Sequence, residues 1–401
     1  MKILLIHNYY QQPGGEDVVF EQEGRLLQQH GHEVITYQRS NHELEQMSAL
    51  KRLARLKQAV SAKDSKRDVR QLLHKHKPDL VHVHNTFMMI STSVYEECCE
   101  MRVPVIQTLQ NYRLLCPAAF FYRDGHVCEE CTNHGLVRSV LHGCYRDSRA
   151  STAAVALMLN RQRVGRRRNN EVSGYLVATE FARTKFINGG LPAAKIHVKP
   201  NFVDNDPGER GGVGNYALFA GRLSPEKGVL TLLAGWSQLG TPVPLMIVGD
   251  GPLRSQLEAE VAKRNLPQVT FRGRLNISET RAAMKQAAFL MLPSLWYEGF
   301  PMVIAESLAC GTPVLGSRLG ATEELIDDGR TGLHFTAGDA SDLARKVEWA
   351  WSHRSEIAAM GHEARREYET LYTPEKNYSQ LMDIYEWLLS ECAHSTAPIV
   401  C

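Results

Sequence analysis

Short apolar runs alternate with segments of helical periodicity along most of the chain. In the first half, runs typical of buried strands lie at residues 3–7, 33–37, 79–85, 104–108, 174–178 and 196–199. In the second half they lie at residues 216–220, 245–248, 269–272, 289–292 and 312–315. Because strands that alternate with helices need crossover connections, the pattern predicts an α/β protein with parallel, doubly wound sheets.

The same pattern predicts where the domains begin and end. Residues 201–214 are polar and rich in glycine with nothing to bury, so we expect a linker there. After Thr336 the periodicity is helical, and Pro374 separates the last two helices. We therefore expect domains at residues 1–200 and 215–372, followed by a helix at 373–392.

One strand, loop and helix unit, residues 290–311, has the features of a ligand site. Its loop carries Glu298 and follows the carboxyl end of a strand, where open α/β sheets bind ligands. The N–H groups of Gly299 and Phe300 open the helix and can bind a phosphate or a sugar hydroxyl. Glu298 and Glu306 can each accept hydrogen bonds from vicinal hydroxyls. Two solvated glutamates beside an ordinary helix would have the same spacing.

Length and composition indicate how many domains the chain can form and in which cellular compartment we expect it. The 401 residues suffice for two cores, and 43% apolar with 22% charged residues is ordinary for a soluble protein. No run of apolar residues is long enough to span a membrane. The opening apolar run covers only residues 3–6, which predicts a first strand rather than a signal peptide. We therefore expect a cytoplasmic protein whose nine cysteines do not form a disulfide framework.

Charge is distributed unevenly between the halves. Residues 1–200 hold 28 Lys and Arg against 19 Asp and Glu, whereas the remainder holds 18 against 25. The excess is concentrated in a helical segment at 48–77 and in an arginine cluster at 161–168. Such a face fits either contact with an anionic membrane surface or a solvated helix. Nucleic acid is not expected, because aromatic interleaving and any binding motif are missing.

Several loops of the first half follow strands. Gly14 and Gly15 let the backbone approach a ligand before a helix begins, although a lone Gly-Gly is most often a turn. No G-x-G-x-x-G is present, which argues against a nicotinamide cofactor. His82 and His84 share one face of a strand that ends at Asn85. Without a third ligand nearby, we interpret them as hydrogen-bonded histidines rather than a metal site.

Four cysteines have a spacing that suits a metal. They form C-x11-C-x2-C-x12-C at Cys116, Cys128, Cys131 and Cys144. A C-x2-C pair with two flanking cysteines can hold one structural zinc, which would fix a segment that is rich in turns. Four free thiols or an occasional disulfide are the alternatives.

A loop with two cations follows the first strand of the second half. Arg222 and Lys227 lie within GRLSPEKG, where a helix also begins, so the loop can bind an anion or be an ordinary surface loop. The strand expected at residues 269–272 is likewise followed by a loop, which begins with Gly273 and Arg274.

The stretch PSLWYEGFPMVIAESLACGTPVL, residues 293–315, resembles the donor-site signature of the family 4 glycosyltransferases. The resemblance covers nearly the whole chain and is strongest over residues 216–333. It implies the GT-B fold, in which two Rossmann-like doubly wound domains face each other across a cleft. It also implies that the terminal helix crosses back to the first domain.

The resemblance also assigns roles to residues of the donor side. Arg222 and Lys227 would grip the donor diphosphate, and Glu306 would hold the ribose. Glu298, with the amides of Gly299 and Phe300, would hold the sugar hydroxyls. Residues 273–275, including Arg274, resemble the wall of the nucleobase pocket, and Gly15 belongs to the glycine loop.

On the acceptor side, the resemblance implies Gly14, Asn85, Gln110 and Asn111. The family usually has a histidine where this chain has Gln110, and glutamine cannot take a proton. The implied activity is retaining transfer of a sugar from a nucleotide-diphosphate sugar, without a catalytic metal, to a glycan or lipid-linked acceptor. A GT-B sugar-nucleotide epimerase and a non-catalytic sugar-nucleotide-binding protein stay open as alternatives.

Overall fold

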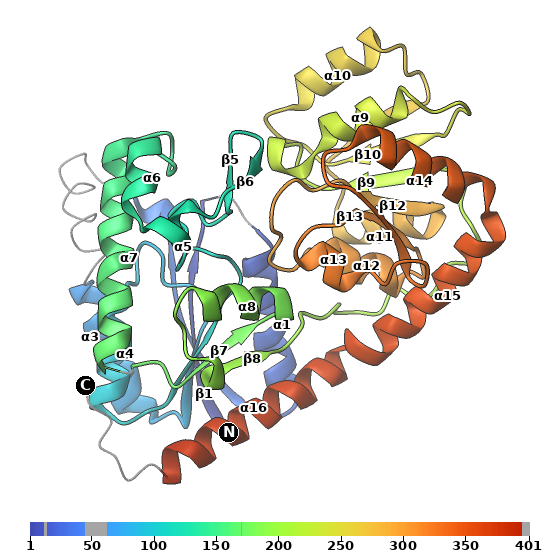
Figure 1. Cartoon of the computed structure of the whole chain (residues 1–401). Helices are drawn as coiled ribbons and strands as arrows, with labels where there is room; N and C mark the ends of the chain where they lie inside the picture. Colours follow the sequence, from blue (N-terminus) through green and yellow to red (C-terminus); the bar gives the residue numbers. More distant parts are fainter. Residues whose placement is uncertain (12–13, 45–61, 170, 395–401) are drawn as a thin grey trace. The chain divides into compact units, whose positions relative to one another are not determined.

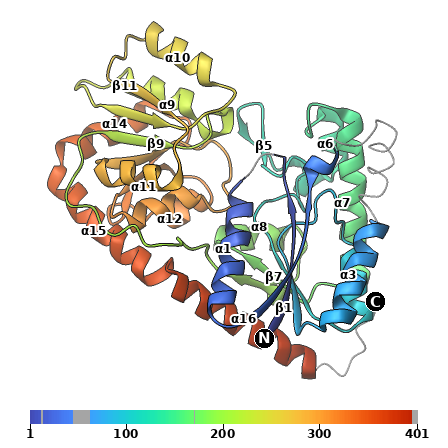
Figure 2. The same cartoon turned by 180° about the vertical axis from the view of Figure 1, so that it is seen from behind.

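The computed structural model describes residues 1–11, 14–44, 62–169 and 171–394 (Figure 1). The chain divides into two compact units. Unit 1 comprises residues 1–119, 129–199 and those from 378 onward, and unit 2 comprises residues 120–128 and 200–377. Each unit is a parallel sheet with helices on both faces (Figures 1 and 2).

Unit 1 contains a six-stranded sheet in the order β2-β1-β3-β4-β7-β8, and every neighbouring pair is parallel. The strands are β1 (Lys2–Tyr9), β2 (Glu33–Ser40), β3 (Leu80–Val83), β4 (Val105–Thr108), β7 (Gly174–Val177) and β8 (Ile196–Val198). The helices are α1 (Gly15–Gln29), η1 (Asn41–Leu44), α3 (Lys63–His76), α4 (Ser93–Glu100), α5 (Glu130–His134), α6 (Val137–His142), α7 (Arg149–Asn169), α8 (Glu180–Asn188) and η2 (Ala193–Lys195).

Unit 2 contains a second six-stranded parallel sheet, in the order β11-β10-β9-β12-β13-β14. The strands are β9 (Ala217–Ala220), β10 (Leu245–Val248), β11 (Val269–Gly273), β12 (Phe289–Leu292), β13 (Val314–Ser317) and β14 (Gly332–Phe335). The helices are η3 (Pro225–Lys227), α9 (Val229–Trp236), α10 (Arg254–Lys263), α11 (Ile277–Gln286), α12 (Met302–Ala309), α13 (Ala321–Leu325), α14 (Ala340–Ser352) and α15 (Arg354–Leu371). A small hairpin, β5 (Tyr122–Arg123) with β6 (His126–Val127), also belongs to it. The predicted doubly wound α/β architecture is confirmed.

The sheet of unit 2 separates two apolar layers. On one face, Trp236 of α9 and Leu343 of α14 pack with Phe219 of β9. On the other face, α11, α12 and α13 form a second core that includes Leu290 and Ile304. The opposite placement of these helices is visible in Figure 1. Burial on both faces explains why the strands are continuously apolar rather than alternating.

The last helix, α16 (Pro374–His394), enters the core of unit 1 from residue 378 onward. Leu381, Tyr385 and Leu388 recur at helical spacing and pack with Ile3 of β1 and Phe20 of α1. The helix begins at Pro374, with two residues between it and the end of α15, because proline fits a first turn and cannot continue an earlier helix.

A buried ionic network joins α16 to the sheet of unit 1. Glu23 of α1 accepts a hydrogen bond from the Lys199 ammonium at 2.8 Å, and one of its oxygens lies 3.0 Å from Nδ1 of His82 and 3.3 Å from Nε2 of His84. The Tyr385 hydroxyl lies 2.6 Å from the same His82 nitrogen. Burial alone would raise the pKa of Glu23, but Lys199 and the histidines hold that pKa well below its usual range.

The expectation that His82 and His84 lack a third ligand is therefore wrong, because Glu23 lies within ligand distance of both. The sequence could not indicate Glu23 as a third ligand, because it lies on a different element and some sixty residues before the histidines. His82 is nevertheless hydrogen-bonded, as expected, to the hydroxyls of Tyr385 and Thr108. Among the described residues, the ring nitrogens of His84 have only the ion-pair contact of 3.3 Å with Glu23. The Lys199 ammonium already compensates the Glu23 charge and would repel a divalent cation at the same carboxylate.

Two segments differ from the sequence expectation. Residues 201–214 do bury side chains: Phe202 and Val203 are almost fully buried, and the Arg210 guanidinium donates to the carbonyls of Ala287, Ala288 and Ile357. This segment therefore packs within unit 2 rather than acting only as a linker. From the sequence, Arg210 counts as an exposed polar residue, because the main-chain carbonyls to which it donates belong to distant segments.

The basic segment 48–77 lies outside the described residues up to position 61. Its remainder, α3, pairs its cations with the acidic helix α4: Lys66 lies 2.9 Å from Glu96, and Arg70 lies 2.7 Å from Glu100. The described part of this face is thus partly neutralised. Among the helices that the structure describes, none is long and apolar enough to cross a membrane.

Replacing Lys199 with Met should lower the free energy of unfolding by about 3–5 kcal/mol, because Glu23 would lose its buried counter-charge. Since the folded-state pKa of Glu23 is depressed, this stabilisation is present above the ordinary pKa of a glutamate and is lost as the pH falls through the depressed value. Calorimetry of the full chain at neutral pH measures the loss in the free energy of unfolding. Lys75→Met, at an exposed lysine of α3, is the matched control.

Adding Glu23→Gln to Lys199→Met should restore part of the lost stability, since a neutral amide costs less to bury than a carboxylate. A Lys199→Met chain as stable as the Lys75→Met chain would contradict a stabilising role for the network.

Candidate functional site

In unit 2, two loops meet where the order of the sheet reverses. Strand β9 lies between β10 and β12: the chain runs from β9 through β10 to β11 on one side, and then crosses back to β12 on the other side of β9. The carboxyl ends of such a strand pair are where open α/β sheets bind ligands. The loop after β9 holds η3, and the loop after β12 leads into α12. The N–H of Leu295 in the second loop donates to the carbonyl of Glu226 in the first, at 2.8 Å.

A glycine permits this close approach. Gly228 has a φ of +67°, and a Cβ at this position would lie 1.8 Å from the carbonyl oxygen of Pro293. No side chain can therefore be added here without moving one loop away from the other. The Gly228 backbone also ends η3 and begins α9, so a single residue fixes both the turn and the distance between the loops.

The two loops bring Lys227 and Glu298 together. The Lys227 ammonium lies 2.7 Å from a carboxylate oxygen of Glu298, and the Ser294 hydroxyl donates to that same oxygen at 2.7 Å. Glu298 is only 4% exposed, whereas Lys227 is half-buried. The ammonium also lies 5.3 Å from the centre of the Trp296 ring, close enough for a cation–π interaction. The result is a cation held at the sheet's switch point and open to solvent on one side.

The other predicted donor-side residues lie on loops that follow strands of the same sheet. Arg222 lies on the loop after β9 and Arg274 directly after β11, and both are exposed. Gly299 and Phe300 come just before Pro301, the N-cap residue of α12. The first turn of α12 has no side-chain cap, so its N–H groups are available to a ligand. The ring of Phe300 packs edge-on against Tyr372 at 5.9 Å.

Glu306 lies one helical turn further along α12. Its carboxylate accepts a hydrogen bond from Arg281 of α11 at 3.4 Å, and burial raises the pKa of Glu306. Arg281 in turn donates to the main-chain carbonyls of Asp204 and Asn205, which fixes its position.

Three side chains at this site were not found from the sequence: Ser294, Trp296 and Arg281. Ser294 follows a strand and was read only as the end of that strand. Arg281 lies on a different helix from Glu306, so no local motif could have indicated it. Trp296 stands inside the recognised motif, and its indole N–H is buried without a hydrogen-bond partner among the described residues.

In unit 1, the predicted acceptor-side residues gather at the carboxyl ends of β1, β3 and β4. Asn85, Gln110 and Asn111 line one small cavity of about 50 Å³ there. The Asn85 amide donates to the Asn8 carbonyl at 2.6 Å, and its oxygen accepts from the Phe87 N–H at 3.0 Å, so Asn85 shapes the cavity wall.

Two further contacts fix the residues around this cavity. Asn111 donates to Glu16, in the first turn of α1. The Gly14 N–H donates to Asp17 at 2.9 Å, which closes the start of the same helix. Nothing lies within 4 Å of a Cβ placed on Gly14 or Gly15, so the chain leaves open space in front of them.

The four cysteines do not form a preorganised metal site. Cys116 and Cys131 are buried, whereas Cys128 and Cys144 are half-buried. Within the described residues, the one group of three or more potential ligands with atoms inside 4.8 Å of one another is Glu23, His82 and His84. Zinc at the cysteines therefore stays a prediction. Elsewhere, Cys99 is disulfide-bonded.

Gly228→Ala should destabilise unit 2 by roughly 3 kcal/mol or more. A left-handed backbone costs an L-residue about 1–2 kcal/mol, and the contact with the Pro293 carbonyl adds a steric cost of about 1–3 kcal/mol. Gly273→Ala is the matched control, because Gly273 has a φ of +70° and nothing within 4 Å of its Cβ. Calorimetry should show a clearly smaller loss for the control. Equal losses would mean that the loops do not depend on this approach.

If the four cysteines bind one structural zinc, elemental analysis of protein purified without added metal should find about one equivalent. Removing the metal should then increase hydrogen exchange at residues 116–144 and leave the sheet of unit 2 unchanged, because thiolate ligation couples metal to local folding. A zinc content below about a tenth of an equivalent would refute this prediction.

Family models match both halves of the chain. The model described as glycosyltransferase family 4 matches residues 13–206, and the one described as glycosyl transferases group 1 matches residues 207–367. The second match includes Arg222, Lys227, Glu298 and Glu306.

Individual relatives are more distant. An uncharacterized glycosyltransferase of Methanocaldococcus jannaschii is 32% identical over 174 residues, 43% of this chain and 48% of the relative. The phosphatidyl-myo-inositol mannosyltransferase of Mycobacterium leprae is 33% identical over 184 residues, 43% and 47% of the respective chains. The chain thus spans about half the length of these curated relatives.

The fold matches over nearly the whole chain. Anabaena HepE, solved in complex with UDP, superimposes with a TM-score of 0.68 and covers 96% of this chain and 100% of its own, at 19% identity. This likeness shows the GT-B fold that the sequence predicted. Since the two family models together span residues 13–367, the chain belongs to the family 4 glycosyltransferases.

Proposed function

We propose that the protein is a retaining hexosyltransferase that moves a sugar from a nucleotide-diphosphate sugar to a glycan or lipid-linked acceptor. The observation that carries the proposal is the Lys227–Glu298 pair at the switch point of unit 2, with Arg222 on the same loop. A cation and a carboxylate 2.7 Å apart suit a ligand that has a diphosphate next to a ring of hydroxyls. Family membership supports the same reading.

Each residue of the site would meet one part of the donor. Lys227 and Arg222 would bind the diphosphate, assisted by the uncapped first turn of α12. Glu298 would then exchange part of its contact with Lys227 for hydrogen bonds from the sugar hydroxyls. Glu306, already oriented by Arg281, would accept hydrogen bonds from the ribose.

Sugar transfer from such a donor depends mainly on positive charge that is held in place beside the diphosphate. As the bond from the anomeric carbon to the diphosphate breaks, negative charge grows on the diphosphate, and preorganised cations lower the barrier. The acceptor oxygen would bond to the anomeric carbon on the face that the diphosphate leaves. Its proton would pass to the departing diphosphate oxygen, which accounts for retention without a protein nucleophile. We propose that no divalent cation is required for this step.

On the acceptor side, we propose that unit 1 positions the acceptor but does not act as a base. Gln110 can orient an acceptor hydroxyl by hydrogen bonding but cannot remove its proton. If the protein is a transferase, the diphosphate must therefore take the proton of the acceptor hydroxyl. The absence of a base at Gln110 also favours one alternative, a protein that binds sugar nucleotides without turning them over.

The relatives indicate candidate donors and acceptors. The HepE structure was solved with UDP, and the mycobacterial relative is named for phosphatidyl-myo-inositol and a mannosyl group. For this chain we propose a role in bacterial surface polysaccharide synthesis, in the cytoplasm. Its basic segments 48–77 and 161–168 would make peripheral contact with anionic membrane.

Arg222→Ala and Lys227→Ala should each lower the rate constant of sugar transfer by about 100-fold or more, while donor binding weakens less, because the charge that these side chains meet develops in the transition state. Lys227→Arg should recover only part of the rate, since a planar guanidinium does not replace a point charge. Arg345→Ala, at an exposed arginine of α14, is the matched control. A thermal-shift screen of UDP, GDP and ADP first selects the donor base.

The same assay separates the alternatives. Release of free nucleotide from donor alone would indicate an epimerase, and donor binding without turnover would indicate a non-catalytic protein. NMR of the product should show the donor's anomeric configuration, and an inverted product would contradict retention. Near-normal rates in both alanine variants, or activity that EDTA abolishes and magnesium alone restores, would refute the assignment of Arg222 and Lys227.

A further inference from the structure

A second cavity in unit 1 lies beside the acceptor-side cavity. It has a volume of about 290 Å³, near the lower end of the range for ligand pockets, which is roughly 300–1,000 Å³. Its walls come from the loop after β4, from α7, from the start of β7 and from the turn that follows α8. Leu114, Leu159 and Gln162 line both cavities, so the two share a wall.

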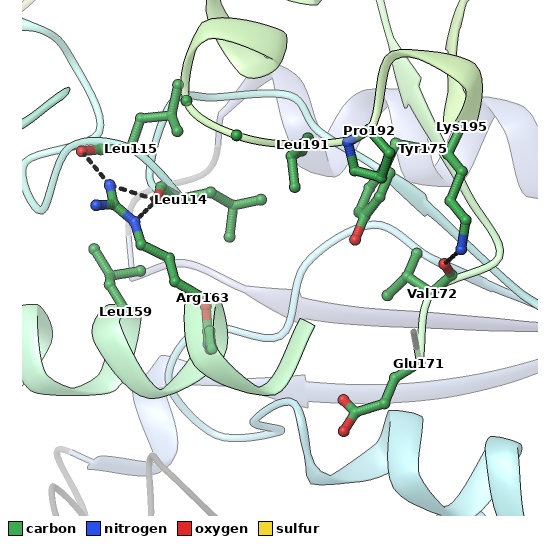
Figure 3. Close-up of a pocket in the computed structure, with 13 residues that line it drawn as sticks. Leu114, Leu115, Leu159, Arg163, Glu171, Val172, Tyr175, Leu191, Pro192 and Lys195 are labelled. Atoms are coloured by element: carbon green, nitrogen blue, oxygen red, sulfur yellow. Dashed lines mark hydrogen bonds between the residues drawn. The ribbon is translucent and has the colours of Figure 1, made fainter. Parts of the chain in front are cut away.

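Apolar side chains form a continuous part of the wall of this cavity, beside polar and charged ones. Leu159 and Val172 are almost fully buried on its floor, and Leu191 points into the space (Figure 3). Leu115 closes one side by packing on Gly189, where a Cβ would come within 2.2 Å of its methyl group. Such walls favour a hydrocarbon occupant, because apolar surface gains from leaving water.

Cations stand at opposite ends of the apolar walls. At one end, the Arg163 guanidinium donates to the carbonyls of Leu114 and Leu115 at 3.1–3.3 Å. At the other end, the Lys195 ammonium donates to the Val172 carbonyl at 3.0 Å. Figure 3 shows both side chains reaching the rim of the cavity from different elements. Main-chain carbonyls thus fix two cations beside an apolar space, which suits an anionic head attached to a hydrocarbon chain.

The balance of charges supports an anion. Glu171 also lines the cavity, so the formal charges are two positive against one negative. Burial lowers the pKa of Lys195, which means that its charged form is poorly solvated where it lies. A phosphate within reach would stabilise that charged form.

We propose that this cavity binds an anionic amphiphile, with its hydrocarbon chain among Leu159, Val172 and Leu191 and its phosphate-type head at Lys195 or Arg163. Resting on the proposed function, the occupant is the lipid part of the acceptor, whose sugar-accepting end reaches Gln110 and Asn85 across the shared wall. The acceptor would then be lipid-linked rather than a free glycan.

Binding of dodecyl phosphate, below its critical micelle concentration, tests the proposal on the full chain. We expect saturable binding with protection from hydrogen exchange at residues 159–163 and 189–195. Inorganic phosphate, which has no chain, and dodecyl maltoside, which has no charge, should each bind at least about ten-fold more weakly. Vesicles of anionic lipid form a fourth arm. If the vesicles protect these residues and monomeric dodecyl phosphate does not, the site is a membrane-contact surface and the proposal is wrong.

Two variants probe the two halves of the site. Lys195→Gln removes one cation, and Leu191→Asp places a negative charge in the apolar wall, so each should weaken binding by about ten-fold or more. Lys75→Gln removes the same charge from exposed α3 and should leave binding within about two-fold. Calorimetry confirms that each variant is folded. If Leu191→Asp does not fold, Lys195→Gln decides, and unchanged binding in that variant would overturn the proposal.

UDP and GDP binding, measured on the same variants, separates this inference from the proposed function. Donor binding without amphiphile binding would refute the cavity's role and leave the proposed function intact. Amphiphile binding without any nucleotide binding would refute the proposed function and support an apolar-anion site alone.

Discussion

The contact of two loops at the switch point of unit 2 determines the rest of the donor-side geometry. Parallel strands β9 and β12 direct their carboxyl ends to the same edge of the sheet, but this alone would leave the following loops several ångströms apart. Gly228 removes the side chain that would separate them, and the bond from Leu295 to Glu226 fixes their register. Only then can Lys227 and Glu298, 71 residues apart, form an ion pair. The chemistry proposed for the site follows from a glycine that takes no part in it.

Polar residues in unit 1 serve a different purpose. Glu23, Lys199 and His82 are buried around the hydroxyl of Tyr385, and each has a charged or hydrogen-bonding partner. An apolar core would exclude water equally well, but it would not specify how α16 is positioned along the sheet. Directional bonds in a buried network supply that specificity, because any shifted packing leaves a charge uncompensated.

Local signals in the sequence predicted the elements well. Thr179, a residue type that favours helix N-caps, caps α8 by accepting a hydrogen bond from the Ala182 N–H, and Pro374 begins the last helix. The motif around Glu298 placed a strand, a loop and a helix correctly, because each is determined by residues close to one another in the chain.

Contacts between distant segments were not predictable in the same way. Glu23 beside His82, Arg281 beside Glu306, and Arg210 under three carbonyls each join segments that only the fold brings together. A charged residue reads as exposed in a sequence unless its partner is known. For that reason residues 201–214 resembled a linker, and the cations of α3 resembled an open basic face although α4 supplies their counter-charges.

The route of the chain through unit 1 has a consequence for its synthesis. Strand β1 and helix α1 leave the ribosome early, but the apolar side chains that cover them, Leu381, Tyr385 and Leu388, are translated only after all of unit 2. At roughly 5–20 residues per second, the interval is some tens of seconds. During that time nearly all of unit 2 is made as well, whereas the face of unit 1 awaiting α16 stays exposed. We expect nascent chains to need a holding chaperone at that face, and the first part of the protein to be made is the last to finish folding.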